Sequence, residues 1–171
     1  MTSNVQLLHY ILNHRLPPGQ LFLGVFSSDN LPIEVGSNSC LIVNYSKRNQ
    51  PGTHWVAMKN LNTNEPEYFD SYGRAPDTDD RFVSNRTNFD SYLRNHSTSG
   101  QYQYNTIDLQ SWNVNGPDDD VCGQWCIAFL YHGLPRNSSK FWRPFLNEQS
   151  REKRDEMIAS LVKIFPSNKK L

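Results

Sequence analysis

The chain has 171 residues, enough to bury a substantial core, and we predict a single domain over residues 1–171. Its 17 basic and 17 acidic side chains cancel, so no overall field attracts nucleic acid or a membrane surface. The longest apolar run, at residues 21–26, is too short to cross a bilayer. Three cysteines and no N-terminal apolar segment predict a reducing, intracellular compartment.

The first half of the chain predicts a helix followed by strands. Ser3-Asn4-Val5-Gln6 has the form of a capping box, and apolar residues at helical spacing predict a helix over residues 4–15. Short apolar or β-branched segments predict two strands, at residues 21–26 and 40–45. An antiparallel hairpin is predicted next, formed by residues 54–61 and 67–72.

The second half predicts further helices and one more strand. Thr78 and the two aspartates after it are a candidate cap for a helix that carries Phe82, Phe89 and Leu93 on one face. A strand at 102–107 and a polar loop at 113–120 are predicted to follow.

Near the C-terminus, four apolar residues recur at helical spacing: Ile158, Leu161, Val162 and Phe165. We interpret the charged run at 151–156 as the solvated face of this last helix. Helices at both ends and strands between them predict an α+β domain.

Cys122 lies at the predicted start of an apolar helix, and the aspartates at 118–120 are candidate N-caps. Backbone N–H groups and the helix dipole at such a position stabilise a thiolate, the form of cysteine that attacks carbonyls. Gly123 is predicted to leave room for a substrate backbone beside the sulfur. A cysteine at a buried helix start can equally be a small apolar residue, so a role as nucleophile depends on further residues.

A thiol nucleophile needs a base and a group that orients the base, and the predicted hairpin carries one of each. His54 opens one strand, and Asp70 lies in the other. Because side chains alternate across a sheet, the two share a face only if paired residue numbers sum to an even number. Taken singly, His54 also fits a partly exposed strand histidine, and Asp70 a carboxylate near a turn.

Three segments, in order, resemble the adenovirus maturation protease (adenain) family, which is related to proteases specific for ubiquitin-like proteins. They are Gly52-Thr53-His54-Trp55, Phe69-Asp70-Ser71-Tyr72-Gly73, and Asn115-Gly116-Pro117 followed by Cys122-Gly123. The similarity runs from the first helix to about Leu130 and is poor beyond it. It implies an adenain-like, papain-like fold, in which helices flank a central mixed sheet and the nucleophile lies at a helix N-terminus.

The resemblance implies a Cys-His-Asp triad, with Cys122 as nucleophile, His54 as general base and Asp70 as orienting acid. The acid in this family is often Glu, so Asp70 is a variant of the pattern. Trp55 and Gly123 are expected to contact the substrate.

The family places an oxyanion-binding glutamine seven residues before the cysteine, where this chain has Asn115. Gln110 is the rival donor if residues 111–115 are an insertion. The backbone N–H of Cys122 is expected to be the second donor in either case.

By resemblance, the chain is a viral or virus-like thiol endopeptidase that processes virion precursor proteins, commonly at glycine-containing sites. Two alternatives remain: a protease that deconjugates ubiquitin-like proteins, and a non-catalytic binding or assembly module of the same fold. We expect a monomer that takes protein or peptide substrates, has no membrane partner, and acts in the host nucleus or in the virion.

Two departures from the family concern cofactors. The family is activated by a short viral peptide through a disulfide, but the corresponding residues 102–104 contain no cysteine, so a covalent activator is not expected. The family is also basic and uses DNA, whereas this chain is neutral, so any DNA stimulation should be weak and salt-dependent. No cofactor or metal is predicted to be required, and Cys40 and Cys126 are interpreted as core residues.

Overall fold

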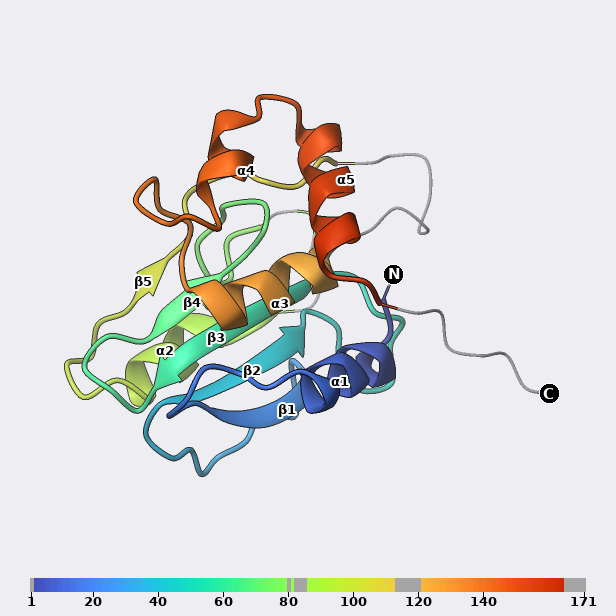
Figure 1. Cartoon of the computed structure of the whole chain (residues 1–171). Coiled ribbons are helices and arrows are strands. Elements are labelled where there is room, and N and C mark those ends of the chain that lie inside the picture. Colours follow the sequence, from blue (N-terminus) through green and yellow to red (C-terminus); the bar gives the residue numbers. More distant parts are fainter. Residues whose placement is uncertain (1, 80, 82–85, 113–120, 165–171) are drawn as a thin grey trace.

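A mixed sheet with the strand order β1-β2-β3-β4-β5 runs through the centre of the molecule (Figure 1). The computed structural model describes residues 2–79, 81, 86–112 and 121–164. Its strands are β1 (Leu21–Ser27), β2 (Ser39–Asn44), β3 (Trp55–Leu61), β4 (Glu67–Phe69) and β5 (Gln103–Tyr104). Parallel pairs form the two edges (β1 with β2, and β4 with β5), while β3 pairs antiparallel with both of its neighbours.

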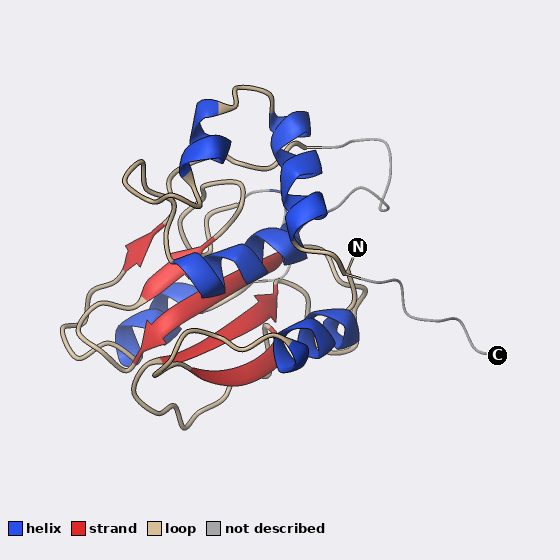
Figure 2. Ribbon diagram, in the orientation of Figure 1, coloured by secondary structure: helices blue, strands red, loops and turns tan. Residues whose placement is uncertain are grey.

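Helices cover both faces of this sheet (Figure 2). They are α1 (Asn4–Asn13), α2 (Phe89–Asn95), α3 (Cys122–His132), α4 (Arg143–Asn147) and α5 (Arg151–Leu161). Helix α3 lies across the sheet over β3, and α2 lies behind the sheet (Figure 1). The predicted α+β class, a mixed sheet flanked by helices, is confirmed.

Side chains along the central strands alternate between the two faces of the sheet, so the core has two layers, one on each face. Ala57 and Phe69 pack with α1, α3, α4 and α5, whereas Val56, Met58 and Tyr68 pack with α2. Because helices cover both faces of the sheet, β2 is buried along its whole length. The sequence predicts a short apolar strand here but not that both of its faces are buried.

The capping box predicted for the first helix is confirmed. Ser3 Oγ accepts the N–H of Gln6, and the Gln6 side chain accepts the N–H of Ser3. The helix ends at Asn13, two residues before its predicted end, and it buries Leu7 and Ile11. The outer face of α1 also carries apolar side chains: Val5 is 65% exposed and Leu12 is 71% exposed.

Helix α2 begins at Phe89, later than the cap predicted at Thr78. Its first N–H groups are capped from a distance, since Asp77 accepts those of Phe89 and Asp90, each at 2.9 Å. Phe82 lies outside the described residues. The predicted strand at 102–107 is also shorter than expected, because only Gln103 and Tyr104 pair with β4.

Helix α5 contradicts our interpretation of residues 151–156 as a solvated face. Arg154 and Asp155 are each only 9% exposed, although their neighbours in the charged run are exposed. Both side chains reach inward to the segment 108–111. Of the predicted apolar positions, Ile158 is buried and Leu161 is 59% exposed; Phe165 lies outside the described residues.

Candidate active site

The register of the β3–β4 hairpin brings His54 and Asp70 to the same side of the sheet. Ala57 pairs with Phe69 and Met58 with Tyr68, so paired residue numbers sum to an even number, as the sequence required. The two residues each lie one position outside a strand: His54 before β3, and Asp70 after β4. Continued alternation therefore turns both toward one face.

His54 and Asp70 are in direct contact and almost completely buried. His54 Nε2 lies 2.9 Å from Asp70 Oδ1, which also accepts the backbone N–H of Tyr72 at 2.8 Å. The other carboxylate oxygen, Oδ2, is buried and has no hydrogen-bond partner among the described residues. The carboxylate thus holds the imidazole by its Nε2 edge.

The backbone around Asp70 is held by residues far along the chain. Asn105 Nδ2 donates to the carbonyl of Asp70 at 2.8 Å and to that of Ile107 at 2.9 Å. Gly73 has a φ of +70°, and a Cβ there would lie 2.7 Å from the backbone carbon of Ile107. Only glycine fits this close approach, which places segment 105–110 against the turn that carries Asp70.

Cys122 is the first residue of α3, and its sulfur lies beside the start of β3. The backbone N–H of Trp55, the residue after His54, donates to Cys122 Sγ at 3.4 Å. This hydrogen bond joins the helix layer to the hairpin at the point where His54 and Asp70 meet. Helix α3 begins after Val121, which offers no side-chain cap; the aspartates predicted as caps lie outside the described residues.

Aromatic rings surround the imidazole of His54. Tyr72 lies 4.8 Å and Tyr45 6.0 Å from it, measured between ring centroids. Burial, with a contribution from the charge of Asp70, raises the pKa of Tyr45 well above its ordinary value. Tyr45 is therefore neutral, and the rings of Tyr45 and Tyr72 both pack against the imidazole of His54.

A second buried carboxylate, Asp79, lies close enough to interact electrostatically with His54. Burial opposes the ionisation of Asp79, but hydrogen bonds from Arg81 outweigh this effect and lower its pKa. The Arg81 guanidinium in turn stacks 4.0 Å from the ring centroid of Tyr72 and 4.4 Å from that of Trp112. The sequence suggested Asp79 only as a helix cap, and no local motif marks it as a neighbour of the site.

These contacts bring His54 to Asp70 and place Trp55, the residue after His54, against the sulfur of Cys122. The family model for the adenovirus endoprotease matches residues 22–163. The chain belongs to the adenovirus endoprotease family.

Two adenovirus proteases show the extent of this similarity. The protease of Bovine adenovirus B serotype 3 is 32% identical over 137 residues, which are 77% of this chain and 64% of the relative. The protease of Bovine adenovirus C serotype 10 is 27% identical over 76% of this chain and 65% of its own length. The chain thus aligns with slightly less than two thirds of each relative. A solved structure of an ASFV protease is 14% identical, covers 77% of this chain and 45% of its own, and has a TM-score of 0.38.

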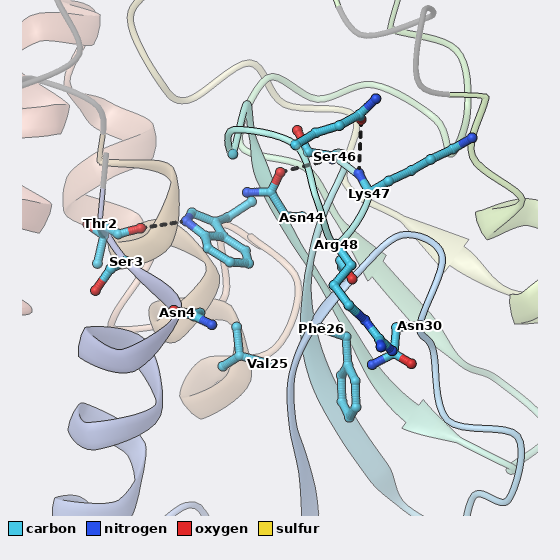
Figure 3. A pocket seen from close by; sticks show the side chains of 14 residues that line it. Thr2, Ser3, Asn4, Val25, Phe26, Asn30, Asn44, Ser46, Lys47 and Arg48 are labelled. Atoms are coloured by element: carbon cyan, nitrogen blue, oxygen red, sulfur yellow. Dashed lines mark hydrogen bonds between the residues drawn. The ribbon is translucent and has the colours of Figure 1, made fainter.

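Trp55, the residue after His54 in this member of the adenovirus endoprotease family, borders a cleft of about 490 Å³. The N-terminal segment forms one wall, and the end of β1 with the loop after β2 forms the other (Figure 3). The indole Nε1 of Trp55 donates to the carbonyl of Thr2 at 2.8 Å, so the ring is fixed in the cleft wall (Figure 3). No local motif predicts this contact, because Thr2 and Trp55 are 53 positions apart in the chain.

Gly123 lies where α1 packs against the start of α3. A Cβ at this position would lie 2.9 Å from Leu7 Cδ2 and 3.3 Å from the Cβ of Thr2. The space beside this glycine is therefore taken by the chain's own N-terminal segment. Gly123 thus lets α1 pack closely against the start of α3, and the predicted contact of Gly123 with substrate stays a prediction.

The structure describes only one of the two candidate oxyanion donors. Asn115 lies outside the described residues. Gln110 is buried, and its Oε1 accepts the hydroxyl of Ser71 at 2.7 Å, which ties its amide to the residue after Asp70.

The remaining cysteines lie in the core. Cys40 and Cys126 are buried and reduced, and burial raises the pKa of the Cys40 thiol to about 12. Within the described ranges, no group of three or more His, Cys, Asp or Glu side chains is arranged to hold a metal ion. None of the described helices is long and apolar enough to cross a bilayer.

Proposed function

We propose that this chain is a cysteine endopeptidase with Cys122 as nucleophile, His54 as general base and Asp70 as the residue that orients the base. The observation that carries the proposal is the contact between the start of α3 and the β3–β4 hairpin. The N–H of Trp55 donates to Cys122 Sγ at 3.4 Å, and Nε2 of the adjacent His54 lies 2.9 Å from Asp70 Oδ1. Membership of the adenovirus endoprotease family supports it.

The first half of the reaction forms an acyl-enzyme. Since Nε2 of His54 faces Asp70, Nδ1 is the ring nitrogen that takes the proton of the thiol. The thiolate then attacks the scissile carbonyl carbon, forming a C–S bond and moving the carbonyl electron pair to oxygen. When that pair returns, the C–N bond breaks and the imidazolium protonates the departing amine.

The second half releases the acid product. His54 removes a proton from a water molecule, which attacks the thioester carbon and displaces Cys122 as a thiolate. Asp70 holds the imidazole ring in one orientation through both steps and stabilises its charged form.

We assign oxyanion stabilisation to the backbone N–H of Cys122, at the start of α3, together with one side-chain amide. Asn115 is our first choice for that amide, because a Gly-Pro pair follows it as in adenain, and Gln110 is the alternative. Replacing each by Ala separates them: the true donor should lower kcat by about 100-fold or more, and the other by much less.

The proposed substrate is an extended segment of a protein, with glycine near the cleaved bond. The cleft beside Trp55 supports this choice because its walls combine apolar side chains, such as Val25 and Phe26, with amides such as Asn30 and Asn44. We propose virion precursor proteins as the natural substrates and the infected cell's nucleus or the virion as the place of action. We further propose that the enzyme is monomeric and needs neither a covalent peptide nor a metal.

The direct test is hydrolysis of fluorogenic peptides with glycine at the cleavage point, by the wild type and by three variants. Cys122→Ser and His54→Ala should reduce kcat by about 1,000-fold or more, and Asp70→Asn by about 100-fold or more. Cys126→Ala, one helical turn from Cys122, is the matched control and should keep wild-type kcat. Equal activity of Cys122→Ser and the wild type would refute the proposal.

The same assay separates the two alternatives that the sequence left open. A deconjugating protease should cleave a ubiquitin-like fusion much faster than a short glycine-containing peptide. A binding or assembly module should cleave neither. The endopeptidase proposal expects comparable kcat/KM for the short peptide and for the same sequence presented in an unfolded protein.

A further inference from the structure

Two charged residues of α5, Arg154 and Asp155, are buried against segment 108–111, which contains the oxyanion candidate Gln110. Arg154 donates from its guanidinium to the carbonyls of Asp108, Glu148 and Leu109, at 3.0, 2.9 and 3.0 Å. The adjacent Asp155 accepts both the N–H and the hydroxyl of Ser111, at 2.9 and 2.6 Å. Arg154 thus binds the beginning of segment 108–111, and Asp155 binds its end.

Asp155 also contacts the nucleophile helix. Its Oδ1 accepts the indole N–H of Trp125 at 3.0 Å, and Trp125 lies on α3 within one turn of Cys122. The Asp155 carboxylate, on α5, therefore links Ser111 to α3. Its described hydrogen bonds come from two residues: Ser111 donates two and Trp125 donates one.

The opposite side of segment 108–111 is bound to the turn that carries Asp70. The carbonyl of Ser71 accepts the N–H groups of Leu109 and Gln110, at 2.8 and 3.1 Å. The Ser71 hydroxyl donates to Gln110 Oε1 at 2.7 Å. The segment is consequently held between the residue next to Asp70 and the helix that carries Cys122.

We propose that Asp155 is a positioning residue for the reaction at Cys122: by tying Ser111 to Trp125, it sets segment 108–111 at a fixed place relative to α3. This inference rests on the function proposed above. Gln110, one of the two oxyanion candidates, depends on that placement because it lies in the segment. Arg154 supports the same placement through the carbonyls of Asp108 and Leu109.

The buried position of Asp155 also supports a positioning role for its carboxylate. Burial raises the pKa of Asp155, although hydrogen bonds from Ser111 and Trp125 act in the opposite direction. A buried carboxylate is costly to ionise, and a neutral side chain would fill the space at lower cost. A neutral amide, however, could not accept from all three donors, since its nitrogen is itself a donor.

The test compares turnover with thiol reactivity in Asp155→Asn. We expect kcat for peptide hydrolysis to fall by about 10- to 100-fold with KM within about twofold, since a small misplacement of a stabilising group costs that much. Alkylation of Cys122 by iodoacetamide should stay within about twofold of wild type, because that reaction forms no oxyanion. Glu156→Gln, the exposed neighbour on α5, is the matched control and should leave both rates unchanged.

Ser111→Ala and Trp125→Phe each remove one donor and keep the carboxylate, so the inference remains testable if Asp155→Asn does not fold. Each should lower kcat by about threefold or more without slowing alkylation. The positioning role is wrong if the wild type is active and these variants match it, or if alkylation, turnover and melting temperature fall in parallel. If the wild type itself hydrolyses no peptide, the proposed function fails first and this inference fails with it.

Discussion

At the residue scale, the surroundings of each cysteine determine what its sulfur can do. Both Cys122 and Cys40 are buried, but the Cys122 sulfur lies at the start of α3 and accepts the N–H of Trp55, whereas Cys40 lies on β2. Burial raises the pKa of the Cys40 thiol to about 12, so this residue stays a protonated thiol throughout the neutral range. Because both thiols are buried, a difference in their reactivity must come from the groups around each sulfur rather than from burial alone.

We predict that iodoacetamide labels the native protein at Cys122 and leaves Cys40 unmodified between about pH 6 and 9. The Cys40 thiol should begin to react only as the pH approaches its raised pKa, or after unfolding. Peptide mapping by mass spectrometry after timed alkylation checks this result. Cys122→Ser is the control, and rapid native labelling of Cys40 would contradict the prediction.

At the element scale, the position of the turn after β4 depends on segment 105–110, which packs against it. Gly73 and Gly100 have nearly equal positive φ angles, +70° and +73°. A Cβ on Gly73 would collide with the backbone of Ile107 and Asp108, whereas a Cβ on Gly100 meets nothing within 4 Å. The two glycines therefore separate the cost of backbone strain from the cost of a steric clash.

We predict that Gly100→Ala lowers the free energy of unfolding by about 1–2 kcal/mol, the cost of a left-handed backbone alone. Gly73→Ala should cost about 1–3 kcal/mol more, because backbone atoms must also move. Urea unfolding followed by tryptophan fluorescence measures both. Only Gly73→Ala should also lower kcat, since it displaces the turn that carries Asp70; equal effects of the two variants would refute this account.

At the scale of the whole molecule, charge balance is the main property that separates this chain from a strongly basic protease. With 17 basic and 17 acidic residues, the chain offers no excess of cations to replace the counterions of DNA. Lys47 and Arg48 do lie together at the cleft beside Trp55, so a local contact with phosphate is available. Any effect of DNA should therefore be small.

We predict that duplex DNA changes kcat/KM for a peptide by less than about threefold at 50 mM salt, and not at all at about 200 mM salt. The measurement is peptide hydrolysis with and without DNA at the two salt concentrations. Lys47→Gln with Arg48→Gln should remove the low-salt effect, measured for the double variant as the ratio of its kcat/KM with DNA to its own kcat/KM without DNA. A large stimulation that persists at high salt would show a DNA site that the charge balance does not reveal.

Local sequence determined those features that depend on neighbouring residues. The capping box at Ser3 and Gln6, the apolar strands and the helix that begins at Cys122 were all predicted, because caps and side-chain periodicity act over a few positions. The even register of the hairpin was stated as a requirement, and the structure meets it. The resemblance to the family added the roles of His54, Asp70 and Cys122, which no single segment could supply.

Tertiary structure decided everything that depends on residues far apart in the chain. The late start of α2, capped by Asp77, and the burial of Arg154 and Asp155 both depend on partners at least twelve positions away. The reason for Gly123 likewise appears only when Leu7 packs against it. A charged side chain in a polar run looks solvated until the fold brings donors and acceptors around it, because its solvation depends on neighbours that local sequence does not specify.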